Sequence, residues 1–276
     1  MTIKELFRYC SEQLSFSDSP EFEAICIFED LLNISKSKIY FDDIVVTDEQ
    51  IKTVESVINR RKNGEPLQYI LGKWDFYDMT FNVGKGVLIP RPETETLVDF
   101  ALEKIKDIDS PVIYDLCAGS GCIGLTIANH RKDAKVFLLE KEDGALTYLK
   151  SNKEKYNLDN AFIIKGDLFE VDFLNFPDAD VILSNPPYIP ACEIESLQKE
   201  VHFEPITALN GGIDGLDFYR CIAEKWISKV KKNGYIALEC GEEQSEDIIN
   251  LFNGKYSEKQ VIYDFNNIDR IVTFGI

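Results

Sequence analysis

The stretch Pro111–Ala128 reads PVIYDLCAGSGCIGLTIA and decides the fold. Its first half is a short apolar run, which predicts a buried strand over Val112–Leu116. Gly119, Gly121 and Gly124 follow in the spacing G-x-G-x-x-G, and the apolar residues after them predict a helix. Glycines in such a loop permit a tight turn and a close approach of the backbone to a ligand, with the helix N-terminus directed at it. The stretch therefore predicts a ligand site after the first strand of an α/β sheet.

Three acidic residues near this loop indicate which ligand it holds. Glu140 ends the next expected strand, where a carboxylate accepts hydrogen bonds from ribose hydroxyls. Asp115 ends the first strand, where its charge would repel a pyrophosphate and suit a ligand that carries a cation. Asp167 ends the third strand and can accept a hydrogen bond from an adenine amino group, or it can be an ordinary turn aspartate. These residues predict an adenosine cofactor and favour S-adenosylmethionine over a nicotinamide dinucleotide, the alternative being a glycine turn needed only for packing.

The rest of the chain predicts two domains joined by a hairpin. Helical spacing of apolar residues, Pro20 at a helix start and a capping box at Thr47–Gln50 predict a helical domain over residues 1–72. Residues 73–90 predict a β-hairpin linker, within Trp74–Ile89. A helix from about Glu93 to Lys106 then opens a domain over 91–276, where strands alternate with helices, as in a mainly parallel sheet. The expected strands are Val112–Leu116, Val136–Glu140, Phe162–Ile164, Val181–Ser184, Tyr235–Cys240, Val261–Phe265 and Ile271–Phe274.

Composition excludes several classes of protein. The 276 residues include 30 Lys and Arg against 48 Asp and Glu, a net charge of −18 that disfavours tight, sequence-independent nucleic-acid binding. Seven cysteines without a C-x-x-C pair predict buried thiols rather than disulfides or zinc, and two histidines make a metal site unexpected. The charged N-terminus is unlike a signal peptide, and no apolar stretch predicts a membrane span. We expect a cytoplasmic protein without a metal.

A second motif follows the expected strand Val181–Ser184. Asn185-Pro186-Pro187-Tyr188 lies at its carboxyl end, the edge at which open α/β sheets bind ligands. The two prolines fix the backbone and remove two donors, so the carbonyls of Asn185 and Pro186 become rigidly placed acceptors. The Asn185 side chain adds another acceptor, and Tyr188 adds a flat face. This set suits a planar nitrogen that bears two hydrogens, and it favours methyl transfer to that nitrogen; a simple proline turn is the alternative.

Together these motifs resemble the release factor glutamine methyltransferases, the HemK/PrmC family. The resemblance also includes PLQYILG at 66–72, LIPRPETE at 88–95, the segment from His202 to Gly215, and E-x-G-x-x-Q at Glu239, Gly241 and Gln244. It implies a class I S-adenosylmethionine-dependent methyltransferase with a Rossmann-like seven-stranded sheet. It also implies methylation of the glutamine in the GGQ loop of peptide chain release factors.

The resemblance assigns roles to residues of this sequence. Asn185 and the Pro186 carbonyl would hold the substrate amide, with Pro187 completing the turn and Tyr188 packing on the amide. S-adenosylmethionine, which leaves as S-adenosylhomocysteine, would be lined by Asp115, Cys117, Ala118, Gly119, Ser120, Gly121, Glu140, Asp167, Leu168 and Asn185. Arg91 and Glu93 would support the site, His202 is given no proton-transfer role, and the helical domain would grip the release factor. We expect a monomer that binds neither nucleic acid nor membrane.

The sequence departs from the family pattern at two places. Cys117 stands where many methyltransferases have the first glycine of the loop, and Asp264-Phe265-Asn266-Asn267 replaces a glycine-containing turn. Asparagine tolerates left-handed backbone, so the second departure is expected to be neutral.

Four alternative functions remain. NPPY fits a ribosomal-protein glutamine methyltransferase equally well. The net charge argues against an adenine-specific DNA methyltransferase. Asp115 and NPPY argue against a nicotinamide-dependent dehydrogenase, and intact Asn185 and Glu140 argue against a binding module without turnover.

Overall fold

The computed structural model describes residues 1–42, 44–172, 175–264 and 266–276. By its contacts the chain forms two compact units, Met1–Lys73 with Gln198–Phe203, and Trp74–Leu197 with Glu204–Ile276. Across the described ranges, no helix is long and apolar enough to cross a membrane.

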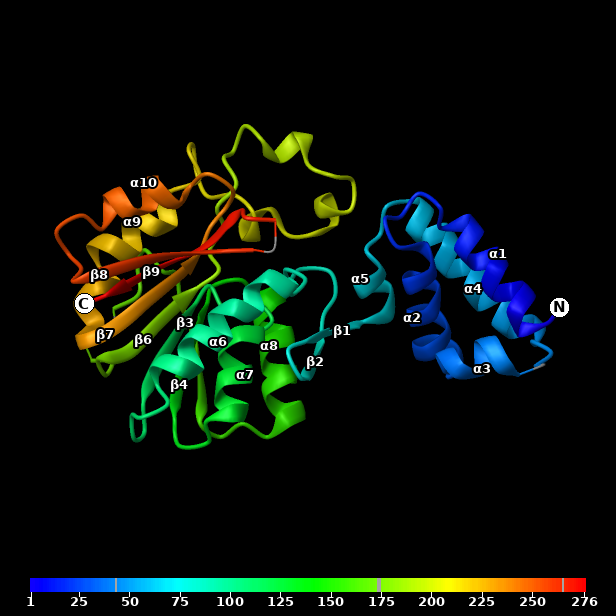
Figure 1. The fold of residues 1–276 in the computed structure, drawn as a ribbon, viewed down its shortest axis with the longest axis horizontal. Coiled ribbons are helices and arrows are strands. Elements are labelled where there is room, and N and C mark those ends of the chain that lie inside the picture. The colour runs from blue at the N-terminus through cyan, green and yellow to red at the C-terminus, as the bar shows by residue number, and fades with distance from the viewer. Residues whose placement is uncertain (43, 173–174, 265) are drawn as a thin grey trace. The chain divides into compact units, whose positions relative to one another are not determined.

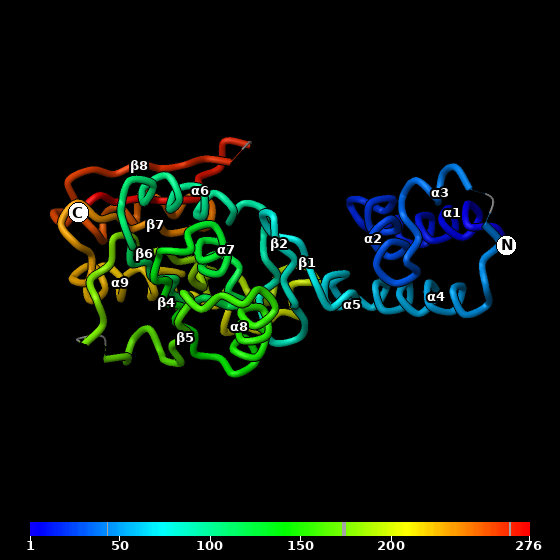
Figure 2. Tube along the Cα trace, turned by 90° about the horizontal axis from the view of Figure 1, so that it is seen from below, coloured from blue at the N-terminus to red at the C-terminus, as the bar shows by residue number. Residues whose placement is uncertain are grey.

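The first unit is a small helical bundle (Figure 2). One apolar face of each helix forms its core. Its helices are α1 (Ile3–Gln13), α2 (Pro20–Leu32), α3 (Lys36–Phe41), α4 (Asp48–Lys62) and α5 (Leu67–Leu71). α1 packs against both α2 and α4. The capping box expected at Thr47 and Gln50 is confirmed, and Pro20 is the first residue of α2. A second capping box, Thr2 with Glu5, starts α1 and was not predicted.

One buried ion pair crosses this bundle and holds a distant segment of the chain. Arg61 of α4 donates to both carboxylate oxygens of Glu23 at 2.7 and 2.8 Å, and its side chain is only 2% exposed. The same guanidinium donates to Glu200 Oε1 at 2.8 Å. Gln198–Phe203, which the predicted boundaries put with the second domain, therefore belongs to the helical unit.

The second unit is a seven-stranded sheet in the order β5-β4-β3-β6-β7-β9-β8. The strands are β3 (Val112–Leu116), β4 (Lys135–Glu140), β5 (Ala161–Lys165), β6 (Ala179–Ser184), β7 (Val230–Glu239), β8 (Glu258–Tyr263) and β9 (Asp269–Gly275). The pairs from β5 to β7 are parallel, and β9 runs antiparallel to both of its neighbours. This confirms the predicted sheet; β7 is longer than expected, and Phe265 of the expected strand Val261–Phe265 lies outside the described residues.

Helices cover both faces of the sheet (Figure 1). Alternate residues of each strand point to opposite faces, so Ile113 joins one apolar core and Tyr114 the other. The first core contains residues of α6 (Glu95–Lys104), α7 (Cys122–His130) and α8 (Asp143–Tyr156); the second contains residues of α9 (Asp217–Glu224) and α10 (Ser245–Leu251). Burial on both faces explains why the central strands β3 and β6 are almost wholly apolar.

A two-stranded hairpin and several short turns complete the unit. The hairpin strands are β1 (Lys73–Phe76) and β2 (Met79–Asn82), shorter than the stretch that the sequence indicated. Asn82 N donates to Asn152 Oδ1 of α8 at 2.7 Å, which ties β2 to that helix. The 3-10 turns of this unit are η1 (Pro92–Thr94), η2 (Ile194–Ser196), η4 (Ile206–Ala208) and η5 (Trp226–Lys229), whereas η3 (Val201–Phe203) belongs to the helical unit.

The buried ion pair gives a stability prediction with a matched control. Replacing Arg61 with Met leaves the buried Glu23 carboxylate without its cation, which costs about 3–5 kcal/mol. The neighbouring Arg60→Met removes an exposed pair with Glu65 and should cost less than about 1 kcal/mol. Urea unfolding followed by circular dichroism measures both. Equal losses for the two variants would contradict the role given to Arg61.

Candidate active site

Three sequence motifs begin where three neighbouring parallel strands end, and these strand ends are paired with one another. Leu116 of β3 pairs with Ser184 of β6, and Ser184 pairs with Leu238 of β7. The Ser184 hydroxyl also donates to the Leu116 carbonyl at 2.6 Å. The glycine loop, the NPPY turn and the segment Glu239–Gln244 start directly after these residues. They therefore meet at one edge of the sheet, where the chain connections reverse direction and α/β proteins bind ligands.

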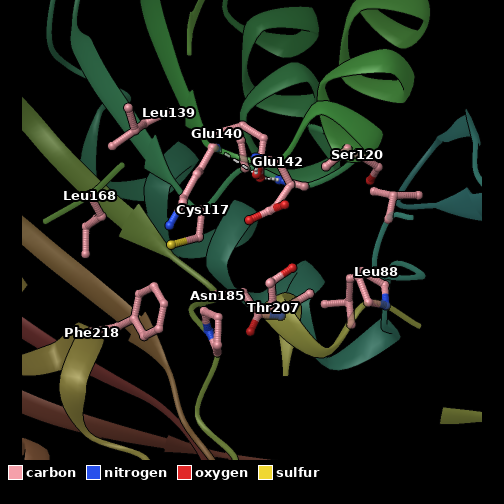
Figure 3. Close-up of a pocket in the computed structure, with 18 of the residues that line it drawn as sticks. Leu88, Cys117, Ser120, Leu139, Glu140, Glu142, Leu168, Asn185, Thr207 and Phe218 are labelled. Carbon is pink, nitrogen blue, oxygen red and sulfur yellow. Dashed lines mark hydrogen bonds between the residues drawn. The ribbon is translucent and has the colours of Figure 1, made fainter. Parts of the chain in front are cut away.

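A cavity of about 290 Å³ opens at this edge (Figure 3). Among the residues predicted for the site, it is lined by Cys117, Ala118, Gly119, Ser120, Glu140, Asp167, Leu168, Asn185 and Pro187. Asp115, Gly121, Pro186 and Tyr188, all in the described part of the chain, are not among its lining residues. In Figure 3, Glu140 and Ser120 lie on one side of the cavity, and Asn185, Thr207 and Phe218 lie on the other.

Glycine is required at the positions of the loop for different physical reasons. Gly121 begins α7 with a φ of 83°, and a Cβ there would lie 2.3 Å from Leu149 Cδ1. Gly124 lets α7 approach β4, because its Cβ would lie 2.8 Å from Leu138 Cδ2. Cys117 also adopts left-handed backbone, with a φ of 63°, which costs a residue with a side chain about 1–2 kcal/mol. This explains why glycine is common at that position in other methyltransferases.

The Glu140 carboxylate holds the loop as well as lining the cavity. Its Oε2 accepts from Gly119 N at 2.8 Å, and its Oε1 accepts from Lys141 N and Glu142 N, both at 2.8 Å. Burial raises the pKa of Glu140, while these backbone donors act in the opposite direction. The carboxylate is thus fixed in place, and its part in binding ribose stays a prediction.

Asp115 lies beneath the loop, fully buried in the sheet. Its Oδ2 accepts from Gly124 N at 2.9 Å, whereas Oδ1 has no hydrogen-bond partner among the described residues. Burial raises the pKa of Asp115 to about 7, with the Gly124 donor opposing and the Glu140 charge reinforcing the shift. An unpartnered buried carboxylate oxygen fits a cationic ligand nearby, but it acts from below the cavity rather than from its wall.

The lining of the cavity fits an adenosine group. Leu139, Leu168 and Phe169 supply apolar surface for a flat base, and Glu140 and Glu142 supply carboxylates that suit hydroxyl groups. Glu142, whose side chain is drawn beside Glu140 in Figure 3, was not predicted, although it stands only two residues further along the sequence. Within the described ranges, no group of three or more His, Cys, Asp or Glu side chains is placed to hold a metal ion.

Other residues that line the cavity were not predicted from the sequence. They include Leu88, Thr94, Thr207 and Phe218. Leu88 and Thr94 belong to the quoted LIPRPETE stretch, so the resemblance could have indicated them. Thr207 lies in the quoted segment from His202 to Gly215, whereas Phe218 belongs to no quoted motif, and only the folded chain brings Phe218 to this edge.

Comparison with known proteins gives the family of this chain. Residues 5–72 match the family described as the PrmC N-terminal domain, and residues 94–200 match the methyltransferase small domain. A release factor glutamine methyltransferase of Thermodesulfovibrio yellowstonii is 39% identical over 99% of this chain and 97% of its own length. Another, of Clostridium acetobutylicum, is 39% identical over 82% of this chain and 81% of its own.

A solved structure shares the fold. The catalytic domain of hMettl16, crystallised with the MAT2A 3′UTR hairpin 6, has a TM-score of 0.57 at 14% identity over 83% of this chain and 82% of that chain. Fold and site together define a class I S-adenosylmethionine-dependent methyltransferase. The chain belongs to the release factor glutamine methyltransferase family.

The buried Asp115 gives the folded protein a specific pH dependence. Because its pKa is raised to about 7, the folded state binds a proton that the unfolded chain releases near pH 4. Its contribution to stability is therefore complete below that pH and is lost as the pH rises to 7. Asp115→Asn keeps an oxygen for Gly124 N and removes this titration. We expect the free energy of unfolding of this variant, relative to the native protein, to increase from pH 4 to 7 and then level off. A constant difference in urea unfolding across that range would contradict the assignment.

Proposed function

We propose that this protein transfers a methyl group from S-adenosylmethionine to the side-chain amide nitrogen of the glutamine in the GGQ loop of peptide chain release factors. The observation that supports this most directly is that the NPPY turn and the glycine loop contribute to one cavity. The names of the relatives support the choice of substrate. Release factors act in translation, so the enzyme is proposed to work in the cytoplasm. It is also proposed to be a monomer.

The cofactor is proposed to lie along the glycine loop. Leu139 and Leu168, which line the cavity, would hold its base, and the carboxylates of Glu140 and Glu142 would hold its ribose. When bound, S-adenosylmethionine supplies a methyl carbon made electrophilic by the attached sulfonium. Glu140 fixes the position of the loop through Gly119 N, and Asp115 would add negative charge beneath it in its ionised form.

The NPPY turn is proposed to hold the glutamine amide. An amide nitrogen is a poor nucleophile because its lone pair is delocalised, so acceptors placed for both of its hydrogens orient it and favour its pyramidal form. The Asn185 side-chain oxygen and the Pro186 carbonyl are the proposed acceptors, with Tyr188 beside them. As the new nitrogen–carbon bond forms, the carbon–sulfur bond breaks with its electron pair going to sulfur, and one amide proton then leaves to water. Catalysis by this turn is orientation and electrostatics, without a strong base.

The helical unit is proposed to bind the release factor away from the GGQ loop. Large apolar side chains at Phe41 and Val45 are exposed on this unit and would suit such a contact. The net charge of −18 indicates a partner with basic residues, so this association should weaken as salt is added.

Mass spectrometry tests the proposed substrate. A release factor is incubated with the protein and S-adenosylmethionine, then digested and sequenced. We expect one added methyl group on the GGQ glutamine and none on other glutamines. No addition on the release factor, with methylation of a ribosomal-protein glutamine in parallel, would favour that alternative and refute the named substrate.

Substitution of Asn185 tests the proposed chemistry. Asn185→Ala removes the side-chain acceptor while leaving the glycine loop intact, so turnover should fall by about 100-fold or more with little change in cofactor affinity. Steady-state rates and calorimetric titration with S-adenosylmethionine measure the two quantities. Turnover equal to that of the native protein would rule out an acceptor role for Asn185.

A further inference from the structure

Two consecutive hydrogen bonds lie behind the Asn185 side chain. Asn185 Nδ2 donates to Thr94 Oγ1 at 3.1 Å, and the Thr94 hydroxyl donates to Glu239 Oε2 at 2.6 Å. Thr94 is 1% exposed and Glu239 is 4% exposed, so water does not compete for these bonds. The three residues come from η1, the end of β6 and the end of β7, and none of these hydrogen bonds joins neighbours in sequence.

We call these two hydrogen bonds the Asn185–Thr94–Glu239 relay. The donor and acceptor groups of the three side chains allow only one direction of donation along it. An ionised carboxylate only accepts hydrogen bonds, so the single hydrogen of the Thr94 hydroxyl is directed to Glu239. The hydroxyl then offers Asn185 only a lone pair, and the amide must present its NH₂ group to it. The Asn185 side chain lines the cavity, and Oδ1 is the group that remains to accept a hydrogen bond there.

We propose that Thr94 and Glu239 are positioning residues that hold the Asn185 amide with its oxygen available to the substrate nitrogen. This inference rests on the proposed function, since it needs Asn185 to accept from the glutamine amide. Neither residue touches the substrate in this account. They decide which of two nearly isosteric orientations of the Asn185 side chain is populated.

The segment that carries Glu239 also holds the other end of the NPPY turn. Gln244 Nε2 donates to the Tyr188 carbonyl at 2.9 Å, and Gln244 Oε1 accepts from Gly241 N at 2.9 Å. Gly215 lies close against the same carbonyl, because a Cβ there would be 2.3 Å from Tyr188 O. Glu239 and Gln244 of the E-x-G-x-x-Q motif thus fix the two ends of NPPY, the first end through Thr94.

The charge state of Glu239 controls the direction of the relay. Burial raises the pKa of Glu239 to about 7, and the Thr94 hydrogen bond opposes that shift. The charged groups around it are Glu93, which raises the pKa, and Arg270 and Arg91, which lower it. The other titratable groups nearby are Tyr188, Tyr219, Cys240 and Cys122 of α7. A protonated Glu239 can donate to Thr94, whose hydroxyl can then donate to Asn185 Oδ1 and reverse the amide. Turnover should therefore fall as the pH drops below 7.

Threonine variants test the relay by kinetics. Thr94→Val keeps the shape and removes the hydroxyl, and we expect kcat to fall about 10- to 100-fold while KM for S-adenosylmethionine changes less than about twofold. Thr94→Ser restores the hydroxyl and should restore kcat to within about threefold. Thr273→Val, a buried hydroxyl of β9 that donates to Gln260 O, is the matched control and should leave kcat unchanged.

A double-mutant cycle separates positioning from general damage. In an Asn185→Ala background, Thr94→Val should cause no further loss of kcat, because the hydroxyl acts only through Asn185. A further loss as large as in the native background overturns the inference, as does native kcat in Thr94→Val. Native kcat in Asn185→Ala instead overturns the proposed function, so the two failures are distinguishable.

If the Thr94→Val protein fails to fold, two further measurements test the inference. Glu239→Gln leaves Thr94 intact and removes one titrating group, so its kcat should be lower at pH 8. Its loss on acidification through pH 7 should be smaller than in the native protein, the remaining loss coming from Asp115. Side-chain amide NMR reports on the hydrogen bond without any substrate. One Asn185 amide proton, assigned from its absence in Asn185→Ala, should exchange slowly in the native and Thr94→Ser proteins. Fast exchange of both protons, or an unchanged pH profile in Glu239→Gln, overturns the inference.

Discussion

The pairing of β3, β6 and β7 at one level is the constraint on which the site depends. Ser184 stands between Leu116 and Leu238, and its hydroxyl bonds to the Leu116 carbonyl at 2.6 Å. A slip of one residue between parallel strands would turn every side chain of β6 to the other face and would break the hydrogen bond from Ser184 to the Leu116 carbonyl. The glycine loop, the NPPY turn and the Glu239–Gln244 segment are distant in sequence, yet this register brings their first residues together.

Departures from ordinary folding preferences gather at this edge. Three buried carboxylates have cationic partners: Glu23 with Arg61, Glu204 with Arg91 and Asp180 with Lys231. Asp115 and Glu239 have no ion pair among the described residues, and burial raises the pKa of each to about 7. Cys117 adds left-handed backbone at the same place. Such features cost stability, and proteins retain them mainly where function requires them.

The parts of the fold that could be predicted are those that depend on residues adjacent in the sequence. Strands β3 and β6 are mostly apolar runs, and the glycine loop and Asn185 follow them, so pattern and position agree. The relay from Asn185 through Thr94 to Glu239 could not be predicted, because it depends on which side chains of three separate segments face one another. The same holds for Gln198–Phe203, whose place in the helical unit follows from the pairing of Glu200 with the buried Arg61.

The central claim is that the NPPY turn presents acceptors to a glutamine amide beside the cofactor. A crystal structure of the protein with S-adenosylhomocysteine and a release factor peptide containing the GGQ glutamine tests it most directly. We expect hydrogen bonds of about 2.7–3.2 Å from the glutamine nitrogen to Asn185 Oδ1 and the Pro186 carbonyl. We also expect Asn185 Nδ2 to remain bonded to Thr94. A peptide amide bound elsewhere in the cavity, or facing Asn185 Nδ2, would contradict it.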